Sequence, residues 1–339
     1  MKRRAFLNTL AASAATAIVP APFMSSVVHA QGKGKMIFLT PAGYSLAFSP
    51  VLYASAAGLF AKEGLDVQIE AGRGAAQVVQ LVAAKQAQAG RTGGANYMIA
   101  RVNNNAPVVA FATIAQRSPF AVISSKNAPI TKPEDLIGKT IGMQSAGGSM
   151  EATLDLMLMR AGIAGDKLRR ERVADSAASF GLIESKRVDG FLGNTSSAIR
   201  LSAQNYPVNT FKLDDGVPGQ VYVAEEAILA ANPAPYVLFT RAVYKSVQAL
   251  LSMNDTDLTK AIATMAGKFD IPGANNTAVA LADLRGNMEL WTTQDPKKIL
   301  RCDEGHWQEA ESLLRKAQLL KAPVTKPLFT NSVWESALG

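Results

Sequence analysis

Hydrophobic and polar positions follow two alternating periods along this chain, which predicts a protein built from strands and helices in turn. Residues 50–62 place their apolar side chains on one helical face, and Gly64 is positioned to end that helix. Residues 65–70 then alternate between apolar and polar, as a half-buried strand does, and residues 72–74 turn the chain into another helical pattern. This stretch therefore predicts a helix-to-strand unit of a parallel sheet.

The same alternation extends over the first third of the chain. The pattern predicts strands at 36–40, 65–70, 88–91 and 107–114, and helices at 48–60, 75–86 and 96–103. Strands that alternate with helices of this length are typical of βα repeats. We therefore expect a first lobe with a mainly parallel sheet.

A second run of the pattern begins near residue 129. It predicts a short helical turn after Pro133, strands ending at Gly142, at 170–173 and at 188–192, and helices at 150–160 and 176–185. Beyond it we expect a strand at 220–224, helices at 225–230, 236–251, 256–267, 275–292 and 307–320, and a tail that is extended or a short helix. The predicted fold class is therefore α/β, with two lobes.

The first thirty residues differ from the rest and are excluded from the fold. Basic residues 2–4 precede an Ala-rich stretch, and Val28-His29-Ala30 is a small-residue cleavage site. We expect an export signal that is cut after Ala30. Residues 3–7 also resemble the twin-arginine consensus, so both the Tat and the Sec route stay open. No cysteine follows the apolar run to receive a lipid, and the run is too short to span a bilayer permanently.

Composition narrows the classes of function. The chain has 339 residues, of which 48% are hydrophobic and 18% charged, an ordinary globular balance with room for two cores. Removal of the signal lowers the formal net charge from +8 to about +5, without basic clusters, so we expect no nucleic-acid binding. Cys302 is the only cysteine, and His306 is the only histidine after the signal. These residues supply neither a disulfide framework nor a metal or nucleophile motif, so we expect no cofactor and no enzyme activity.

Four predicted strands each run into a turn rich in glycine and hydroxyl residues that opens a helix. Such turns lie at the carboxyl ends of parallel strands, where ligands bind, and helix N-termini there present free N–H groups. The candidate ligand-binding residues in these turns are Gly72, Arg73, Gly74, Thr92, Asn96, Ser145, Gly147, Gly148, Ser149, Asn194 and Thr195. The turn from Ser145 to Ser149 is the strongest candidate. Any single turn is more typical of a helix cap, but four turns at equivalent places favour a ligand cleft, so both interpretations remain open.

Two arginines lie next to these turns. Arg73 and Arg91 can each donate two hydrogen bonds to a carboxylate or a sulfonate. Taken singly, each is better interpreted as an exposed surface residue.

Two stretches resemble a known family. Residues 54–67, with Gly58-Leu59-Phe60 and Lys62-Glu63-Gly64-Leu65-Asp66-Val67, and residues 130–142 match signatures of the NMT1/THI5-like solute-binding proteins. The nitrate, sulfonate, taurine and thiamine-pyrimidine binding components of ABC importers belong to this family. Residues 84–90 depart from its pattern, with Lys85 in place of a glycine and Gln88 in place of an aspartate.

The resemblance implies a type II periplasmic-binding-protein fold. Lobe 1 would comprise residues 31–122 and 221–339, lobe 2 would be the insertion 123–220, and two crossings would form the hinge. Tyr44, Ser45 and Phe48 in the first strand-to-helix loop, and Tyr222 at the second crossing, would then face the ligand.

The implied function is capture of a small solute in the periplasm, by closure of the two lobes, for an ABC permease of the inner membrane. The solute would be a sulfonate-, nitrate- or carboxylate-like anion or a pyrimidine, and we expect a monomer. Two alternatives stay open. One is an enzyme of the same fold, similar to a pyrimidine synthase or a hydrolase, and the other is a solute-sensing adaptor for a membrane receptor.

Overall fold

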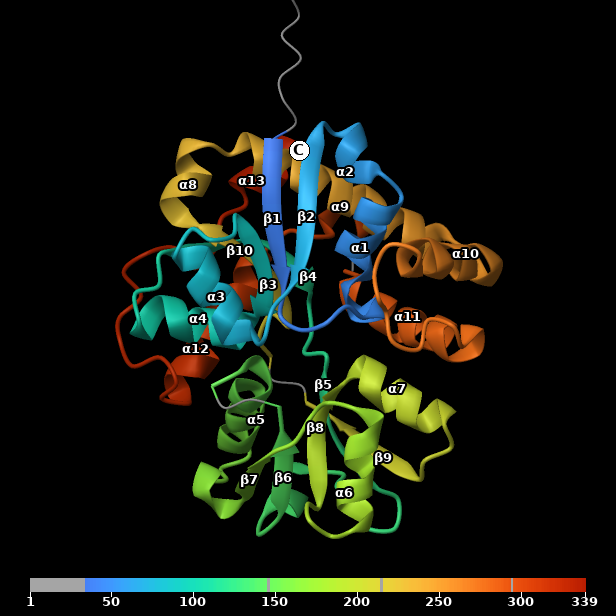
Figure 1. The fold of residues 1–339 in the computed structure, drawn as a ribbon. Coiled ribbons are helices and arrows are strands. Elements are labelled where there is room, and N and C mark those ends of the chain that lie inside the picture. The colour runs from blue at the N-terminus through green and yellow to red at the C-terminus, as the bar shows by residue number, and fades with distance from the viewer. Residues whose placement is uncertain (1–33, 145–146, 214–215, 294) are drawn as a thin grey trace, which may run out of the picture. The chain divides into compact units, whose positions relative to one another are not determined.

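The computed structural model describes residues 34–144, 147–213, 216–293 and 295–339, which form two five-stranded sheets (Figure 1). The first sheet has the order β2-β1-β3-β10-β4, and the second has the order β7-β6-β8-β5-β9. The first comprises β1 (Gly34–Thr40), β2 (Leu65–Ala71), β3 (Ala89–Gly93), β4 (Val108–Ala115) and β10 (Gln220–Glu225). The second comprises β5 (Phe120–Ser125), β6 (Thr140–Met143), β7 (Arg169–Arg172), β8 (Gly190–Asn194) and β9 (Val208–Lys212).

Each sheet is mixed, with one strand running against the others. In the first sheet β1 pairs parallel with β2 and β3, whereas β10 pairs antiparallel with β3 and β4. In the second sheet β6 pairs parallel with β7 and β8, whereas β5 pairs antiparallel with β8 and β9. The predicted fold class, two α/β lobes with mainly parallel strands, is confirmed.

Helices cover both faces of the first sheet (Figure 1). One face packs against α1 (Ser49–Ala56), α2 (Leu59–Lys62), α8 (Glu226–Ala231), α9 (Ala234–Ser252), α10 (Asp255–Ala266), α11 (Thr277–Trp291) and α13 (Ser332–Leu338). The other packs against α3 (Ala75–Ala83), α4 (Gly94–Asn103) and α12 (Glu304–Lys316). Neighbouring strand residues point to opposite faces, so Phe38 contributes to one core and Leu39 to the other.

The second sheet is covered in the same way. The helix α5 (Ser149–Arg160) packs on one face, and α6 (Phe180–Glu184) and α7 (Thr195–Ala203) pack on the other. Short 3-10 helices join several of the main elements: η1 (Leu46–Phe48), η2 (Pro133–Leu136), η3 (Gly165–Lys167), η4 (Ala177–Ser179) and η5 (Pro296–Lys298). The tail is extended apart from α13, as predicted.

The helix predicted over residues 48–60 is divided into three pieces: η1, α1 and α2. The second division falls at Gly58, whose φ of 70° is left-handed and outside helical geometry. Hydrophobic periodicity continues across the break, because Leu52 and Phe60 still reach the same core. The pattern of apolar residues therefore predicted the buried face but missed the break.

The sequence analysis missed two strands, β5 and β9. All but the last residue of β5 is buried, so the strand lacks the apolar and polar alternation that marks a half-buried strand. β9 has five residues and lies at the edge of its sheet, where the apolar signal is weak. The chain leaves the first sheet between Ala115 and Phe120 and returns between Lys212 and Gln220. The lobe limits at 122/123 and 220/221 stay predictions.

The two crossings pack backbone against backbone at Gly219. A Cβ atom on Gly219 would lie 1.7 Å from the carbonyl oxygen of Arg117. That distance is far below van der Waals contact, and a backbone oxygen has little freedom to move away. Gly219 therefore allows the outgoing and returning segments to lie in contact.

We expect Gly219→Ala to destabilise the protein by about 2 kcal/mol or more, because overpacking forces the two backbones apart. A matched control is Gly181→Ala, since a Cβ on Gly181 meets nothing within 4 Å. Thermal denaturation followed by circular dichroism compares the two variants. A melting temperature for Gly219→Ala equal to that of Gly181→Ala would contradict the close contact.

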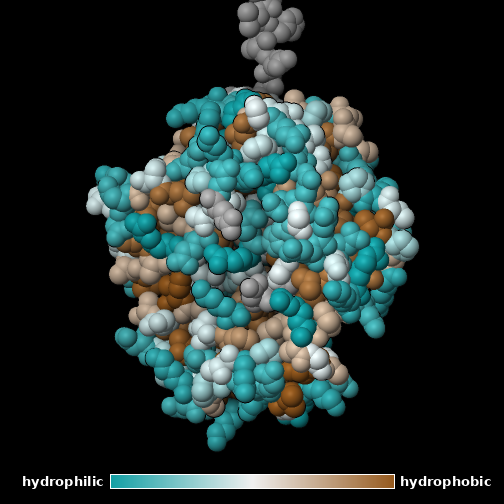
Figure 2. Space-filling model, turned by 180° about the vertical axis from the view of Figure 1, so that it is seen from behind, coloured by the Kyte–Doolittle hydropathy of each residue, from teal (hydrophilic) through white to brown (hydrophobic). Residues whose placement is uncertain are grey.

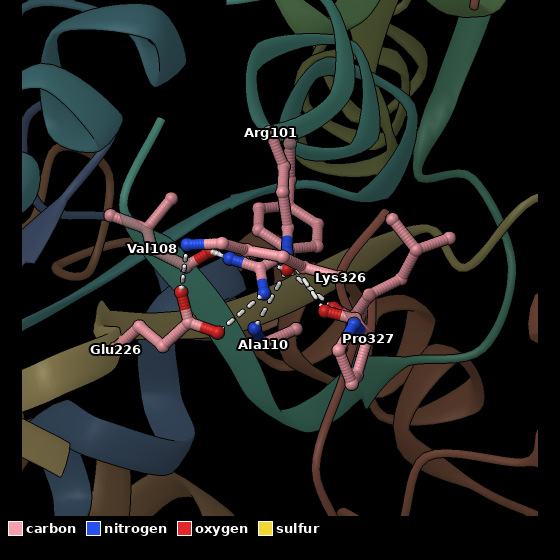
Figure 3. Close-up of polar contacts among 8 residues, drawn as sticks. Arg101, Val108, Ala110, Glu226, Lys326 and Pro327 are labelled. Atoms are coloured by element: carbon pink, nitrogen blue, oxygen red, sulfur yellow. Dashed lines mark hydrogen bonds and ion pairs between the residues drawn. The ribbon is translucent and has the colours of Figure 1, made fainter. Parts of the chain in front are cut away.

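Arg101 fixes the C-terminal segment to the first sheet (Figure 3). Its side chain is 3% exposed, and it donates Nε to the Pro327 carbonyl at 2.8 Å, Nη2 to Glu226 at 2.9 Å and Nη1 to the Val108 carbonyl. Lys326 adds a second ion pair to Glu226 at 3.2 Å. Burial acts to raise the pKa of Glu226, but Arg101 and Lys326 outweigh it and hold this pKa below its ordinary value.

The face drawn in Figure 2 is covered mainly by hydrophilic residues, with hydrophobic residues in small, scattered groups. Among the described residues, Ile137 is the large hydrophobic residue with high exposure, at 52%. Within the same residues, no helix combines the length and the apolar character that crossing a bilayer requires. Ligand contacts are therefore expected in the interior rather than on an apolar surface patch.

Candidate ligand-binding site

A cavity of about 310 Å³ lies between segments of the two sheets. The first sheet contributes the loop after β1, the start of α3, the end of β3 and the start of β10. The second contributes the turns that follow β6, β7 and β8. These turns stand at the carboxyl ends of parallel strands, where α/β folds bind ligands. The walls are mostly apolar, with a few polar groups that converge on the cavity, which is typical of a small-molecule site.

The loop after β1 forms one wall, and it brings Tyr44, Ser45 and Phe48 to the cavity. The Tyr44 hydroxyl donates to the Ile69 carbonyl at 2.9 Å, and its ring lies 5.1 Å from that of Phe269. Burial and the Glu70 charge raise the pKa of Tyr44, so the phenol stays protonated. These contacts hold the aromatic wall in one orientation.

Arg91 is the buried cation of the cavity. The residue is 3% exposed, and it donates Nη1 to the Ala47 carbonyl at 2.6 Å and Nε to Gln220 Oε1 at 3.2 Å. Its guanidinium carbon lies 4.9 Å from the centre of the Phe48 ring. Burial lowers the pKa of Arg91 to about 10, while the nearby Tyr222 acts in the opposite direction, so the side chain is charged at pH 7.

No carboxylate of the described residues forms an ion pair with Arg91. A buried charge is normally paired, because desolvation without a partner is costly. The groups around Arg91 are neutral: a carbonyl, an amide and an aromatic ring. The side chain therefore presents an uncompensated positive charge to the cavity, which suits an anion or a strong hydrogen-bond acceptor.

Gly148 and Ser149 open α5 and line the cavity from the second sheet. The Ser149 hydroxyl oxygen accepts a hydrogen bond from the Gly93 N–H at 3.1 Å. This bond joins the end of β3 to the start of α5. The hydroxyl hydrogen of Ser149 remains available as a donor.

Asn194 and Asp175 form a coupled pair at the cavity. Asn194 caps α7, because its Oδ1 accepts from the Ser197 N–H at 3.1 Å. Its Nδ2 donates to Asp175 Oδ2 at 2.5 Å. The other carboxylate oxygen, Asp175 Oδ1, is buried and has no hydrogen-bond partner among the described residues. Burial raises the pKa of the Asp175 carboxyl to about 6, although Ser197, Arg200 and Asn194 act in the opposite direction.

A second polar group joins α7 to α11 at the edge of the cavity. Arg200 Nη1 lies 3.5 Å from Asp283 Oδ2, and Asn287 Nδ2 donates to the Ser196 hydroxyl at 3.0 Å. Asn287 Nδ2 also donates to Asp283 Oδ1 at 2.8 Å. Both Arg200 and Asn287 line the cavity, so helices of the two sheets meet beside it.

The cavity includes some of the residues predicted from the sequence. Tyr44, Ser45, Phe48, Gly74, Gly148, Ser149 and Asn194 line it. Ser145 lies outside the described residues. Whether the lining residues contact ligand stays a prediction.

Other predicted residues do not line the cavity, because their groups serve the fold. Gly72 N–H donates to the Thr40 carbonyl at 2.7 Å, and the Arg73 side chain is exposed. Thr92 is fully buried and its hydroxyl accepts from Asn96 Nδ2 at 3.1 Å. The helices after these two turns, α3 and α4, have no side-chain cap hydrogen bond, so the roles of the two turns stay predictions.

The remaining predicted residues are also placed elsewhere. Gly147 N–H donates to Glu151 at 2.6 Å, and the Thr195 hydroxyl donates to the Pro119 carbonyl at 3.2 Å. Tyr222 is 1% exposed and packs against Phe38, with ring centres 5.1 Å apart. Tyr222 does not line the cavity in this structure, and its contact with a ligand stays a prediction.

Sequence reasoning missed several polar groups of the cavity, namely Gln144, Asp175, Arg200, Gln220 and Asn287. For Arg91 the preferred interpretation as a surface residue is wrong. The sequence signal was limited to its position at the end of a predicted strand, and the structure shows that all five residues of this strand, β3, are buried. The others carried no local signal, because each is a single polar residue in a loop, on a helix or, for Gln220, at the start of a strand.

The two residues usually considered for nucleophilic chemistry lie away from the cavity. Cys302 is fully buried, and burial raises the pKa of its thiol to about 12, so it is not a thiolate at neutral pH. His306 lies in the first turn of α12 and does not line the cavity. Among the described residues, no group of three His, Cys, Asp or Glu side chains could hold a metal.

Solved structures share this fold at low identity. The alkanesulfonate-binding protein SsuA from Xanthomonas axonopodis pv. citri, bound to MOPS, has a TM-score of 0.65 and 14% identity, with 85% of this chain and 94% of that chain covered. The desulfurization enzyme DSZB has a TM-score of 0.57 and 14% identity, with 90% of this chain and 99% of that chain covered. The fold alone therefore occurs in both a binding protein and an enzyme.

Sequence comparison finds a relative at higher identity than these structures. The riboflavin-binding protein RibY of Chloroflexus aurantiacus is 25% identical over 297 residues, which cover 85% of this chain and 82% of that protein. The family model described as NMT1/THI5 like matches residues 45–256. Because this match spans more than half of the chain, the protein belongs to the NMT1/THI5-like family.

Proposed function

We propose that this protein is the solute-binding component of an ABC importer and that it captures a small organic solute with an anionic or strongly accepting group. The observation that carries the proposal is the buried guanidinium of Arg91, which lines the cavity without a carboxylate partner among the described residues. A sulfonate, carboxylate or ring carbonyl would compensate this charge. The riboflavin-binding protein RibY and the alkanesulfonate-binding protein SsuA support binding of a small organic molecule.

The proposal includes a cycle of lobe closure. The cavity is bounded by residues 31–122 and 221–339 of one proposed lobe and by residues 123–220 of the other. A solute that touches both would favour the closed arrangement, because it binds that state more tightly. The Gly93–Ser149 hydrogen bond and the Arg200–Asp283 ion pair, at 3.1 and 3.5 Å, are contacts that opening would break.

The partners and location belong to the same proposal. The export signal, cut after Ala30, would deliver the chain to the periplasm as a monomer, where the closed form would dock on an ABC permease. Binding is favoured over catalysis because the cavity is lined by neither Cys302 nor His306. The enzyme alternative keeps one supporting fact, the shared fold of the desulfurization enzyme.

The test uses the chain from residue 31 onwards with a defined panel of compounds. The panel contains nitrate, benzoate, uracil, ethanesulfonate, 2-aminoethanesulfonate, lumiflavin, 3-methyllumiflavin and riboflavin. We expect at least one organic member to raise the melting temperature and to bind in the micromolar range or tighter by calorimetry, without being consumed. Small-angle scattering should show compaction on saturation.

Two results would contradict the proposal. One is the absence of binding by every member of the panel at a concentration of about 1 mM. A site with a Kd above about 1 mM is too weak for capture. The other is turnover of the bound compound, which would favour the enzyme alternative.

A further inference from the structure

Asp175 is the cavity group that capture of an anion does not explain. It follows β7 in a turn that leads to η4, and it lines the same cavity as Arg91. A carboxylate would repel a simple anion such as nitrate or an alkanesulfonate. Its presence in the cavity therefore calls for a group of opposite character on the solute.

The hydrogen bond between Asp175 and Asn194 uses only one of the two carboxylate oxygens of Asp175. Oδ2 accepts from Asn194 Nδ2 at 2.5 Å, and through Asn194 it supports the N-cap of α7. Oδ1 is buried and has no partner among the described residues. A buried acceptor without a hydrogen bond is costly, so such an atom is rare unless a bound molecule satisfies it.

The nearby cation does not neutralise this carboxylate. Arg200 forms its ion pair with Asp283, at 3.5 Å between Nη1 and Oδ2, and its Nη2 donates to the Ser197 hydroxyl at 3.5 Å. Asp283 in turn is 2% exposed and needs that partner. Asp175 therefore lines the cavity without an ion-pair partner among the described residues, although Ser197 and Arg200 favour its charged form.

We propose that Asp175 Oδ1 accepts a hydrogen bond from an N–H or O–H group of the solute, so the site selects solutes that carry both an acceptor for Arg91 and a donor for Asp175. This inference rests on the proposed function and narrows its solute class. A site with a buried acceptor rejects analogues that lack the donor, because the acceptor would stay unpaired. Nitrate and simple alkanesulfonates are then poor ligands.

The donor on the solute can be an ammonium group or a neutral ring N–H. Both present an N–H from which a carboxylate oxygen of Asp175 can accept a hydrogen bond. Two matched pairs of probes distinguish these sources. 2-Aminoethanesulfonate carries an ammonium group that ethanesulfonate lacks. Lumiflavin carries one ring N–H, and 3-methyllumiflavin carries a methyl group in its place.

Calorimetry on the unmodified protein compares the members of each pair and needs no variant. We expect the donor-bearing member of at least one pair to bind at least about 10-fold more tightly than its partner, the discrimination that one hydrogen bond to a charged group supplies. The pair that shows the preference identifies the donor as an ammonium or a ring N–H.

Asp175→Asn then assigns the preference to this residue. The amide retains an oxygen for Asn194 but presents an N–H₂ group in place of the free oxygen. We expect the preference within the pair to fall below about 3-fold, with the affinity for the donor-free member unchanged or increased. The control Asp166→Asn, at an exposed position of the second lobe, should leave both affinities unchanged.

Three outcomes would overturn the inference. Equal or tighter binding of the donor-free member in both pairs would do so while leaving the proposed function intact. Equal weakening of both members by Asp175→Asn would show that the residue acts only through Asn194. If no compound of the functional panel binds, the proposed function fails, and the inference fails with it.

Discussion

Arg91→Gln should weaken solute binding by at least about 30-fold while changing the melting temperature of the unliganded protein by no more than a few degrees. Removing one partner of a buried, charge-assisted contact costs about 2 to 5 kcal/mol of binding free energy. The unliganded protein loses the hydrogen bonds to Ala47 and Gln220, but it is also relieved of a buried charge without a counter-ion. The lost hydrogen bonds destabilise the unliganded protein and the removed charge stabilises it, so these two effects on folding oppose one another. Nothing comparable offsets the loss of binding free energy.

The measurement is calorimetry with the panel compound that binds the unmodified protein. Arg73→Gln is the matched control, because Arg73 is an exposed arginine in the turn before α3 and lies outside the cavity lining. We expect the control to bind normally. If Arg91→Gln binds as tightly as Arg73→Gln, the cavity does not use its buried cation.

Arg101→Gln should have the opposite profile, a large loss of stability with normal solute binding. Arg101 is as buried as Arg91, but it is paired with Glu226 and with the Val108 and Pro327 carbonyls (Figure 3). Glutamine cannot reach all of these acceptors, and those left unsatisfied cost about 2 to 4 kcal/mol in total. We expect the melting temperature to fall by about 5 °C or more.

Lys326→Gln is the control for this prediction. Lys326 pairs with the same Glu226, but its side chain is 63% exposed, so its loss should cost less than about 1 kcal/mol. A melting temperature of Arg101→Gln equal to that of Lys326→Gln would contradict the importance of the buried contacts.

The Arg101 effect should also depend on pH. The pKa of Glu226 is held below its ordinary value in the folded protein. The ion pair therefore stabilises the fold above the ordinary glutamate pKa, and this contribution is lost as the pH falls through the lower, folded value. The difference in melting temperature between the unmodified protein and Arg101→Gln should be larger at neutral pH than in acid. The carbonyl contacts persist in acid, so part of the difference remains.

The two arginines illustrate how far a sequence pattern reaches. Arg91 is the last residue of a predicted strand and Arg73 lies in the turn after another, and each stands beside glycines, so the letters alone gave both the same interpretation as surface residues. Arg91 is buried because Gln220 of β10 lies against it, at a sequence separation of 129 residues. A contact of that range depends on the order of strands in the sheet, which the residues around Arg91 do not encode.

The sequence pattern predicted secondary structure where a helix or strand is buried on one face. The period of apolar residues predicted helices at the positions of α3, α5 and α9, where buried residues recur at helical spacing. It missed β5, whose residues do not alternate between apolar and polar, although β4, which is buried throughout, was predicted. It also missed the break at Gly58, because a left-handed glycine interrupts the helix without changing which residues are apolar.

The sequence by itself determined the α/β class, the two lobes of alternating strands and helices, and the family resemblance, since periodicity and glycine turns are local properties of the chain. It also predicted that candidate binding turns would follow the strands. Only the tertiary structure decided that Arg91 and Asp175 meet one cavity and that Tyr222 does not. The physical reason is that burial and charge pairing depend on which distant segments come into contact, and the cavity is formed by residues that the chain separates and the two sheets bring together.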